Sequence, residues 1–125
     1  MKILTRDSTR ETPKILLDKN NNKFEFEGKS RPENVMQFYE PIFNWLEEYS
    51  KSPNEQTYVH MNLEYFNTSS AKAILEILRI LKELHDSGND VKIIWYYHED
   101  DEDMQEAGED YSSMIELPFE YKVYS

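Results

Sequence analysis

Short polar residues stand at the point where a strand-like segment gives way to a helix-like one. The segment reads Tyr65-Phe66-Asn67-Thr68-Ser69-Ser70. Side chains of this class cap a helix by accepting a hydrogen bond from a backbone N–H group, which contributes about 1 kcal/mol. A phosphorylated hydroxyl is also tolerated here, because the phosphate lies beside unpaired N–H groups and the positive end of the helix dipole. The residues alone therefore leave two interpretations open, a helix cap and a phosphorylated binding switch.

Five consecutive carboxylates, residues 99–103, form the second candidate site. Carboxylate oxygens are ligands for divalent cations, so with His98 the run could serve a metal-dependent hydrolase. However, its spacing lacks the alternating ligands, the central glycine and the distal glutamate of a calcium-binding loop. The other histidines, His60 and His85, add no metal-ligand spacing. We therefore expect no metal and interpret the run as a solvated loop or a protein-docking face.

The remaining sequence offers little for catalysis. It contains no glycine-rich phosphate loop, no nucleophile elbow and no zinc-protease motif. It contains no cysteine, which excludes disulfides, zinc–thiolate sites and a cysteine nucleophile. The residues thus predict no catalytic group and no cofactor.

The charge balance limits the classes of partner. The 125 residues include 14 Lys and Arg and 25 Asp and Glu, for a net charge of −11. Nucleic acid and anionic membranes both require a basic surface, so neither is expected as a partner. Aromatic residues make up 14% of the chain, more than disordered acidic chains contain, and predict a folded domain. No apolar stretch is long enough for a membrane span or a signal peptide, which predicts a cytoplasmic protein.

The first half of the chain predicts a hairpin followed by a helix. Residues 14–28 have strand-like patterns on both sides of the turn formers Asn20-Asn21-Asn22. Ser30-Arg31-Pro32-Glu33 has the form of a capping box that would open a helix over about 32–50. Pro41 lies inside the apolar spacing of that helix, so it is expected to kink the helix or to split it in two.

The second half alternates strands with helices. We expect a strand over 58–65 and a strongly apolar helix over 69–87. The near-continuous apolar run over 91–97 predicts a central strand covered on both faces. A weaker helix over 104–115, interrupted at Gly108, precedes a last strand that starts at Pro118. This order predicts a single α/β domain over residues 1–125, with a mixed sheet, an N-terminal hairpin and about three packed helices.

Several motifs together resemble the SiaC family of bacterial regulatory phosphoproteins. They extend from about residue 12 to residue 121, and each would be a weak signal alone. The matching segments are Thr12-Pro13, Gly28-Lys29-Ser30-Arg31-Pro32-Glu33-Asn34, Phe38-Tyr39-x-Pro41-x-x-x-Trp45-Leu46, Leu63-Glu64-Tyr65-Phe66-Asn67-Thr68-Ser69-Ser70, Trp95-Tyr96-Tyr97, Asp100-Asp101-x-Asp103-Met104-x-Glu106-Ala107-Gly108-Glu109-Asp110 and Pro118-Phe119.

The resemblance implies a fold similar to the STAS domains of anti-sigma-factor antagonists, and a partner-switching protein rather than an enzyme. It implies that a serine/threonine kinase with a histidine-kinase-like ATPase fold phosphorylates Thr68, the Thr of the family's Asn-Thr-Ser-Ser motif, and that a PP2C-type phosphatase reverses this. It also implies that the unphosphorylated form binds and activates a diguanylate cyclase, which links the switch to cyclic-di-GMP signalling and biofilm formation.

These expectations combine into one hypothesis about the switch. Thr68 is the phosphorylated residue, and the partner-binding turn comprises Tyr65, Phe66, Asn67, Ser69 and Ser70. Ser69 and Ser70 stay open as alternative phosphorylation sites. For the acidic run, Asp100, Asp101 and Asp103 are predicted to contribute to kinase docking. Two alternatives from other classes remain, a metal-dependent hydrolase that uses residues 99–103 and an acidic scaffold in which Thr68 is only part of a helix cap.

Overall fold

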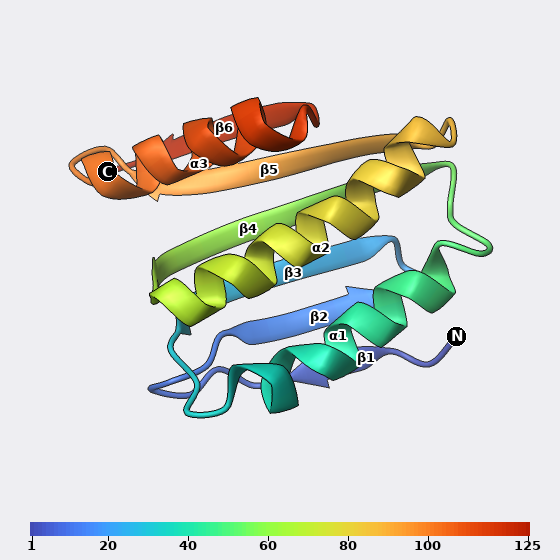
Figure 1. Cartoon of the computed structure of the whole chain (residues 1–125), viewed down its shortest axis with the longest axis horizontal. Coiled ribbons are helices and arrows are strands. Elements are labelled where there is room, and N and C mark those ends of the chain that lie inside the picture. Colours follow the sequence, from blue (N-terminus) through green and yellow to red (C-terminus); the bar gives the residue numbers. More distant parts are fainter.

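The sheet is a single mixed layer of six strands, in which every strand lies beside its neighbours in the sequence (Figure 1). The computed structural model describes all residues, 1–125. The first three strands pair antiparallel, and the pairs from β3 to β6 are parallel. The elements are β1 (Leu4–Arg6), β2 (Lys14–Asp18), β3 (Lys23–Ser30), α1 (Val35–Tyr49), β4 (Gln56–Phe66), α2 (Thr68–Asp86), β5 (Asp90–His98), α3 (Glu102–Ile115) and β6 (Phe119–Tyr124). This confirms the predicted mixed α/β fold with an N-terminal hairpin and three helices.

All three helices pack on the same face of the sheet (Figure 1). Each one connects two neighbouring parallel strands in the same direction across the sheet, and right-handed crossovers of this kind fall on one face. The prediction that the strand over 91–97 is covered on both faces is therefore wrong. Its apolar run arises because Ile93 and Trp95 belong to the core beneath the helices, while Ile94, on the other face, is buried without belonging to that core.

The core lies between the sheet and the helices, with α2 along its middle. Its side chains come from every helix and from β2 to β5. Burial of this apolar surface is the main stabilising contribution to the fold. The largest fully buried side chains are Trp95, Tyr39, Tyr49, Phe24, Ile15, Leu17, Ile42, Leu46, Met61, Ile74, Ile77 and Leu78.

The predicted capping box at Ser30 is wrong. The helix begins at Val35, and Asn34 caps it by accepting a hydrogen bond from the backbone N–H of Gln37 at 3.1 Å. Ser30 is instead the last residue of β3 and is fully buried, so its hydroxyl has partners inside the core. Of the two outcomes expected at Pro41, the split does not occur, because α1 continues through it as one helix.

The C-terminal half differs from the sequence prediction at α3. That helix begins at Glu102, within the predicted acidic loop, and it runs through Gly108 without interruption. A Cβ atom at Gly108 would lie 2.6 Å from the indole ring of Trp95. The glycine therefore allows α3 to approach the sheet closely and does not end the helix. The short strand β1 was not predicted, because its three residues carry no clear alternation.

Replacing Gly108 by Ala is expected to destabilise the fold. The added methyl group would overlap Trp95, and overpacking of this kind typically costs about 1–3 kcal/mol, more than the ~1 kcal/mol that Ala gains as a helix former. Urea unfolding followed by tryptophan fluorescence would measure this. Ser113→Ala, at an exposed position of the same helix, is the matched control and should be neutral or slightly stabilising. Equal effects of the two variants would contradict close packing at Gly108.

Candidate functional site

The turn between β4 and α2 presents Thr68 at the first position of a helix. Asn67 is the N-cap, and its side-chain oxygen accepts hydrogen bonds from the backbone N–H of Ser70 at 2.9 Å and from the hydroxyl of Ser69 at 3.2 Å. Thr68 and Ser69 are exposed, whereas Ser70 is fully buried. Because Asn67 provides the cap, the Thr68 hydroxyl is free of that role and faces solvent.

A cluster of three buried hydroxyl groups holds this turn in place. Ser30 Oγ lies 2.6 Å from the hydroxyl of Tyr39 and donates to Ser70 Oγ at 2.8 Å. The backbone N–H of Asn67 also donates to the Ser30 carbonyl at 3.0 Å. The cluster therefore joins the end of β3, the first half of α1 and the first turn of α2. Ser70, which the sequence left open as a phosphorylation site, is part of this cluster and is closed to solvent.

A second tyrosine ties the same turn to α3. The hydroxyl of Tyr111 donates to the Ala71 carbonyl at 2.8 Å.

Burial raises the pKa of Tyr39 to about 12, although its hydrogen bonds from Ser30 and Ser70 act in the opposite direction. Burial, with a smaller contribution from Tyr39, also raises the pKa of Tyr111 to about 12. Both tyrosines are therefore neutral at physiological pH, and Tyr111 acts as a hydrogen-bond donor.

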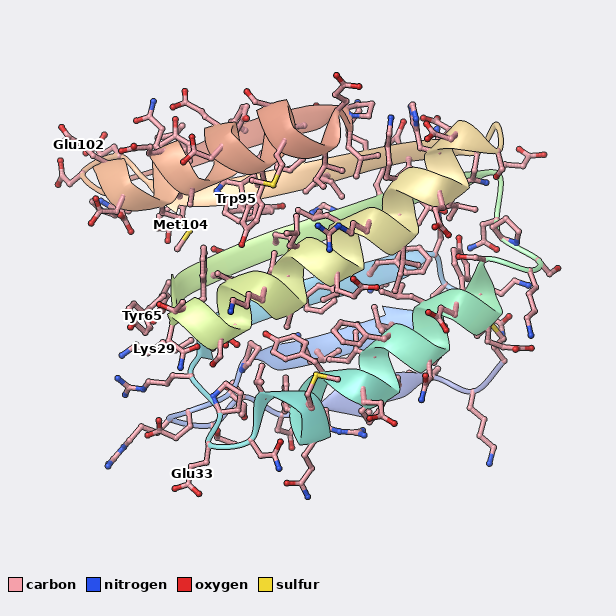
Figure 2. The ribbon with its side chains drawn as sticks, in the orientation of Figure 1. Lys29, Glu33, Tyr65, Trp95, Glu102 and Met104 are labelled. Atoms are coloured by element: carbon pink, nitrogen blue, oxygen red, sulfur yellow. The ribbon has the colours of Figure 1, made fainter.

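A hollow of about 360 Å³ lies between the end of β4 and the start of α3. Tyr65 and Phe66 line it from β4, and Asp101 and Asp103 line it from the α3 side. Tyr65 is 48% exposed, the largest exposed fraction among the tyrosines with exposed side chains. Figure 2 shows Tyr65, Lys29, Met104 and Glu102 at this end of the molecule. The structure thus brings the two predicted segments, residues 65–70 and 99–103, to one end of the sheet.

The acidic segment is only partly a loop. Asp101 is the N-cap of α3, and its carboxylate accepts a hydrogen bond from the backbone N–H of Met104 at 3.0 Å. Glu102 and Asp103 occupy the first turn of that helix, where the helix dipole favours negative charge. Only Glu99 and Asp100 remain in the turn itself. The carboxylates are therefore aligned along a helix start, which the charge pattern alone did not predict.

The side chains offer no arrangement for a metal ion. No group of three or more His, Asp or Glu residues converges in a geometry that could hold one. His98 Nδ1 instead accepts a hydrogen bond from the backbone N–H of Asp100 at 3.0 Å. The metal-dependent hydrolase interpretation of residues 99–103 therefore finds no support in the geometry.

Three residues that line the hollow, Glu64, Met104 and Ala107, were not predicted as site residues. Met104 and Ala107 line it from α3, together with Asp103, and Glu64 lines it from the end of β4. Met104 is buried, and its sulfur points from α3 toward the start of α2 (Figure 2). Met104 and Ala107 stand in the family motif that begins at Asp100, which was a signal for the segment, whereas their apolar spacing predicts core positions rather than the wall of a site.

A family model and several solved structures agree on one family. A model described as "SiaC family regulatory phosphoprotein" matches residues 6–124. An uncharacterised protein of Pseudomonas aeruginosa strain UCBPP-PA14 is 31% identical over 111 residues, covering 89% of this chain and 88% of that protein. The structure of SiaC of P. aeruginosa is similar with a TM-score of 0.91 and 28% identity, covering 99% of this chain and all of that chain (100%).

One similar structure contains a partner. It is the crystal structure of the diguanylate cyclase SiaD in complex with its activator SiaC, from P. aeruginosa. The matching chain has a TM-score of 0.91 and 29% identity, covering 97% of this chain and 99% of that chain. In the present chain, no helix is both long and apolar enough to cross a membrane.

The burial of Tyr39 makes the free energy of unfolding sensitive to alkaline pH. The folded state keeps the Tyr39 proton up to about pH 12, while an unfolded tyrosine loses it near pH 10. The free energy of unfolding should therefore be unaffected by this group below pH 10 and should fall as the pH rises from 10 to 12, by up to about 3 kcal/mol. Tyr39→Phe should show a smaller fall when urea unfolding is measured across this range. Parallel curves for the two proteins would contradict the assignment.

Proposed function

The chain belongs to the SiaC family of regulatory phosphoproteins, and on that premise we propose that it is a non-enzymatic partner-switching protein that activates a diguanylate cyclase when it is unphosphorylated. Through that cyclase it would regulate cyclic-di-GMP signalling and biofilm formation. One observation carries the proposal. Thr68 is an exposed hydroxyl on a rigidly held helix start, beside a hollow that has both apolar and acidic walls.

The hollow supports a docking role for the unphosphorylated state. Its apolar part consists of Tyr65, Phe66, Met104 and Ala107, and its rim contains the carboxylates of Asp101 and Asp103. An aromatic anchor surrounded by polar groups is the usual composition of a protein-binding hot spot. The cyclase would contact this end of the sheet, with Tyr65 as the anchor.

The charges at the two helix starts favour Thr68 as the phosphorylated residue. The first turn of α3 contains Glu102 and Asp103, so the positive end of that helix dipole is already compensated by the chain itself. The first turn of α2 contains no acidic residue. A phosphate on Thr68 would therefore be stabilised by the free N–H groups and the dipole of α2, and would leave the fold intact.

The same phosphate would oppose docking. It adds about −1.5 to −2 charges to an end of the molecule that already contains a series of carboxylates. Burying that charge against a partner without a matching cation costs several kcal/mol, and about 1.4 kcal/mol already lowers affinity tenfold. A serine/threonine kinase with a histidine-kinase-like ATPase fold would add the phosphate, and a PP2C-type phosphatase would remove it.

The carboxylates at the start of α3 are proposed to orient the kinase. Asp100, Asp101 and Asp103 lie at the same end of the sheet as the Thr68 turn, so a kinase that contacts α3 can reach the hydroxyl. They can attract a basic surface on the kinase or stand near its Mg-ATP. This role follows from their position and charge density.

Phosphate incorporation should depend on Thr68 and not on its neighbour. Thr68→Ala is expected to abolish labelling by the kinase, while Ser69→Ala, which alters the adjacent exposed hydroxyl, should be labelled at the normal rate. Phosphopeptide mapping of the tryptic segment 52–72 identifies the residue. Both variants should be as stable as the natural protein within about 0.5 kcal/mol, because both side chains are exposed. Unchanged labelling of Thr68→Ala would overturn the assignment.

The cyclase interaction tests the switch itself. Phosphorylated protein should bind the cyclase at least tenfold more weakly than unmodified protein, measured by calorimetry, and should no longer stimulate cyclic-di-GMP synthesis. Thr68→Asp should shift affinity in the same direction but less, because one carboxylate has a smaller charge than a phosphate. If the phosphorylated and unmodified forms bind the cyclase with equal affinity, the switch is overturned, and the alternative of an acidic scaffold without a phosphorylation switch is favoured.

Neutralising the start of α3 should slow phosphorylation. The triple variant Asp100→Asn, Asp101→Asn, Asp103→Asn keeps the N-cap, because Asn is also a capping residue. Its labelling rate is expected to fall several-fold. The control variant Glu47→Gln, Glu48→Gln, Glu55→Gln changes the net charge equally, but its substitutions lie at the end of α1 and just before β4. Equal rates for the two triple variants would show that only overall charge matters.

A further inference from the structure

The two edges of the sheet are not equivalent. β1 forms one edge and has only three residues, whereas β6 forms the other and has six (Figure 1). A strand at an edge presents unpaired backbone N–H and C=O groups that can pair with another strand, and natural proteins often limit this by keeping edge strands short. β6 does not have that protection.

The backbone direction of β6 defines which residues are free to pair. The carbonyls of Pro118 and Tyr124 accept hydrogen bonds from Ile93 and Glu99, on the side of β5. Alternate residues of a strand direct their backbone groups to opposite sides, so the even-numbered residues bond to β5. The N–H and C=O groups of Phe119, Tyr121 and Val123 therefore point away from the sheet.

The side chains of the same three residues form an apolar row with little cover. They lie on the helix face of β6, where Phe119 packs against Trp95 with ring centroids 6.1 Å apart. α3 packs on Trp95 of β5 through Gly108 and overlaps β6 in Figure 1, but it does not cover the outer side chains of β6 completely. Tyr121 consequently remains 37% exposed and Val123 remains 55% exposed.

We propose that β6 pairs antiparallel with β6 of a second copy of this chain, about a two-fold axis at Tyr121, so that the two sheets become continuous. In this register each Phe119 stands opposite the partner's Val123, and the two Tyr121 residues stand opposite each other. All of these are the residues with free backbone groups, so each facing pair exchanges both N–H···O hydrogen bonds. The apolar row of each chain is covered by the same row of its partner.

Charge complementarity selects this register. On the other face of β6, Glu120 stands directly opposite the partner's Lys122, and this pair occurs twice because of the symmetry. Moving the register by two residues keeps the hydrogen-bonding parity but places Glu120 opposite the partner's Glu120, or Lys122 opposite the partner's Lys122. Like charges directly opposite each other destabilise a strand pair. Within one chain, Glu120 is only loosely held, 3.8 Å from the ammonium groups of Lys92 and Lys122.

The dimer would have two switch sites that point in opposite directions. In one chain, the Thr68 turn lies at the carboxyl end of the parallel strands. A two-fold axis perpendicular to the sheet reverses the strand direction, so the second turn lies at the opposite end of the continuous sheet. Because β6 takes no part in the hollow beside Thr68, dimer formation leaves both sites accessible. The inference is thus independent of the proposed function.

Charge reversal at β6 tests the pairing. The natural chain should show concentration-dependent dimerisation by sedimentation velocity. Glu120→Lys and Lys122→Glu should each weaken self-association by about tenfold or more, because each places like charges opposite each other twice. An equimolar mixture of the two variants should form a heterodimer, and the double variant Glu120→Lys, Lys122→Glu should regain the homodimer. Both side chains are exposed or nearly so, and circular dichroism checks that the variants are folded.

Amide hydrogen exchange of the natural chain gives a second readout that needs no variant. The N–H groups of Tyr121 and Val123 should become protected as concentration rises, while that of Thr68 should not change. A chain that stays monomeric to about 1 mM would overturn the proposal. The β6 edge would then be expected to pair with an extended segment of another protein. A dimer that is insensitive to both single variants, or that leaves Tyr121 unprotected, would also overturn the proposal, since the contact would then lie elsewhere.

Discussion

The buried contact between the hydroxyls of Ser30, Tyr39 and Ser70 is the constraint on which the site depends. Each hydroxyl comes from a different element, and an unpaired buried hydroxyl costs about 1–3 kcal/mol, so the three elements must meet in one arrangement. The contact sets where β3 ends, how α1 begins and where α2 starts. It explains how a surface turn can be well positioned while Thr68, two residues before Ser70, is left exposed.

The two helix starts at this end of the sheet are chemically different. α3 carries its own carboxylates in the first turn and at its cap, whereas α2 has a neutral amide cap and hydroxyls. A negative group therefore has electrostatic support at one start and encounters resident charge at the other. The hollow between them combines aromatic, aliphatic and acidic walls in a small space. The hollow is suited to regulation by charge, because a change in charge at either helix start alters the electrostatic potential across it.

Much of the fold could be predicted from the sequence, because the hairpin, the helix spacing and the alternation of strands and helices are local patterns. Two of the errors share a physical cause, which is contact between residues far apart in the chain. Ser30 matched a capping box, but its partner Ser70 is forty residues away. Gly108 resembled a helix break, yet it is needed because Trp95 lies against it. For the candidate site, the family motif led to the hypothesis that Thr68 is the switch, whereas the place of Met104 in the wall of the hollow became visible only from the way α3 approaches the end of β4.

The order of strands in the sheet has a consequence for how the chain assembles. Every strand pairs with the strand before it and the strand after it, so no strand has to enter between two that are already paired. Each parallel pair closes a loop of one strand–helix unit, as where Phe24 stands opposite Val59, and this strand order avoids the longer loop closures that a non-sequential order would need. During synthesis, the sheet can grow outward from the N-terminal hairpin as each helix and strand leaves the ribosome. The chain then folds in the order in which it is made, and β6 completes the sheet last.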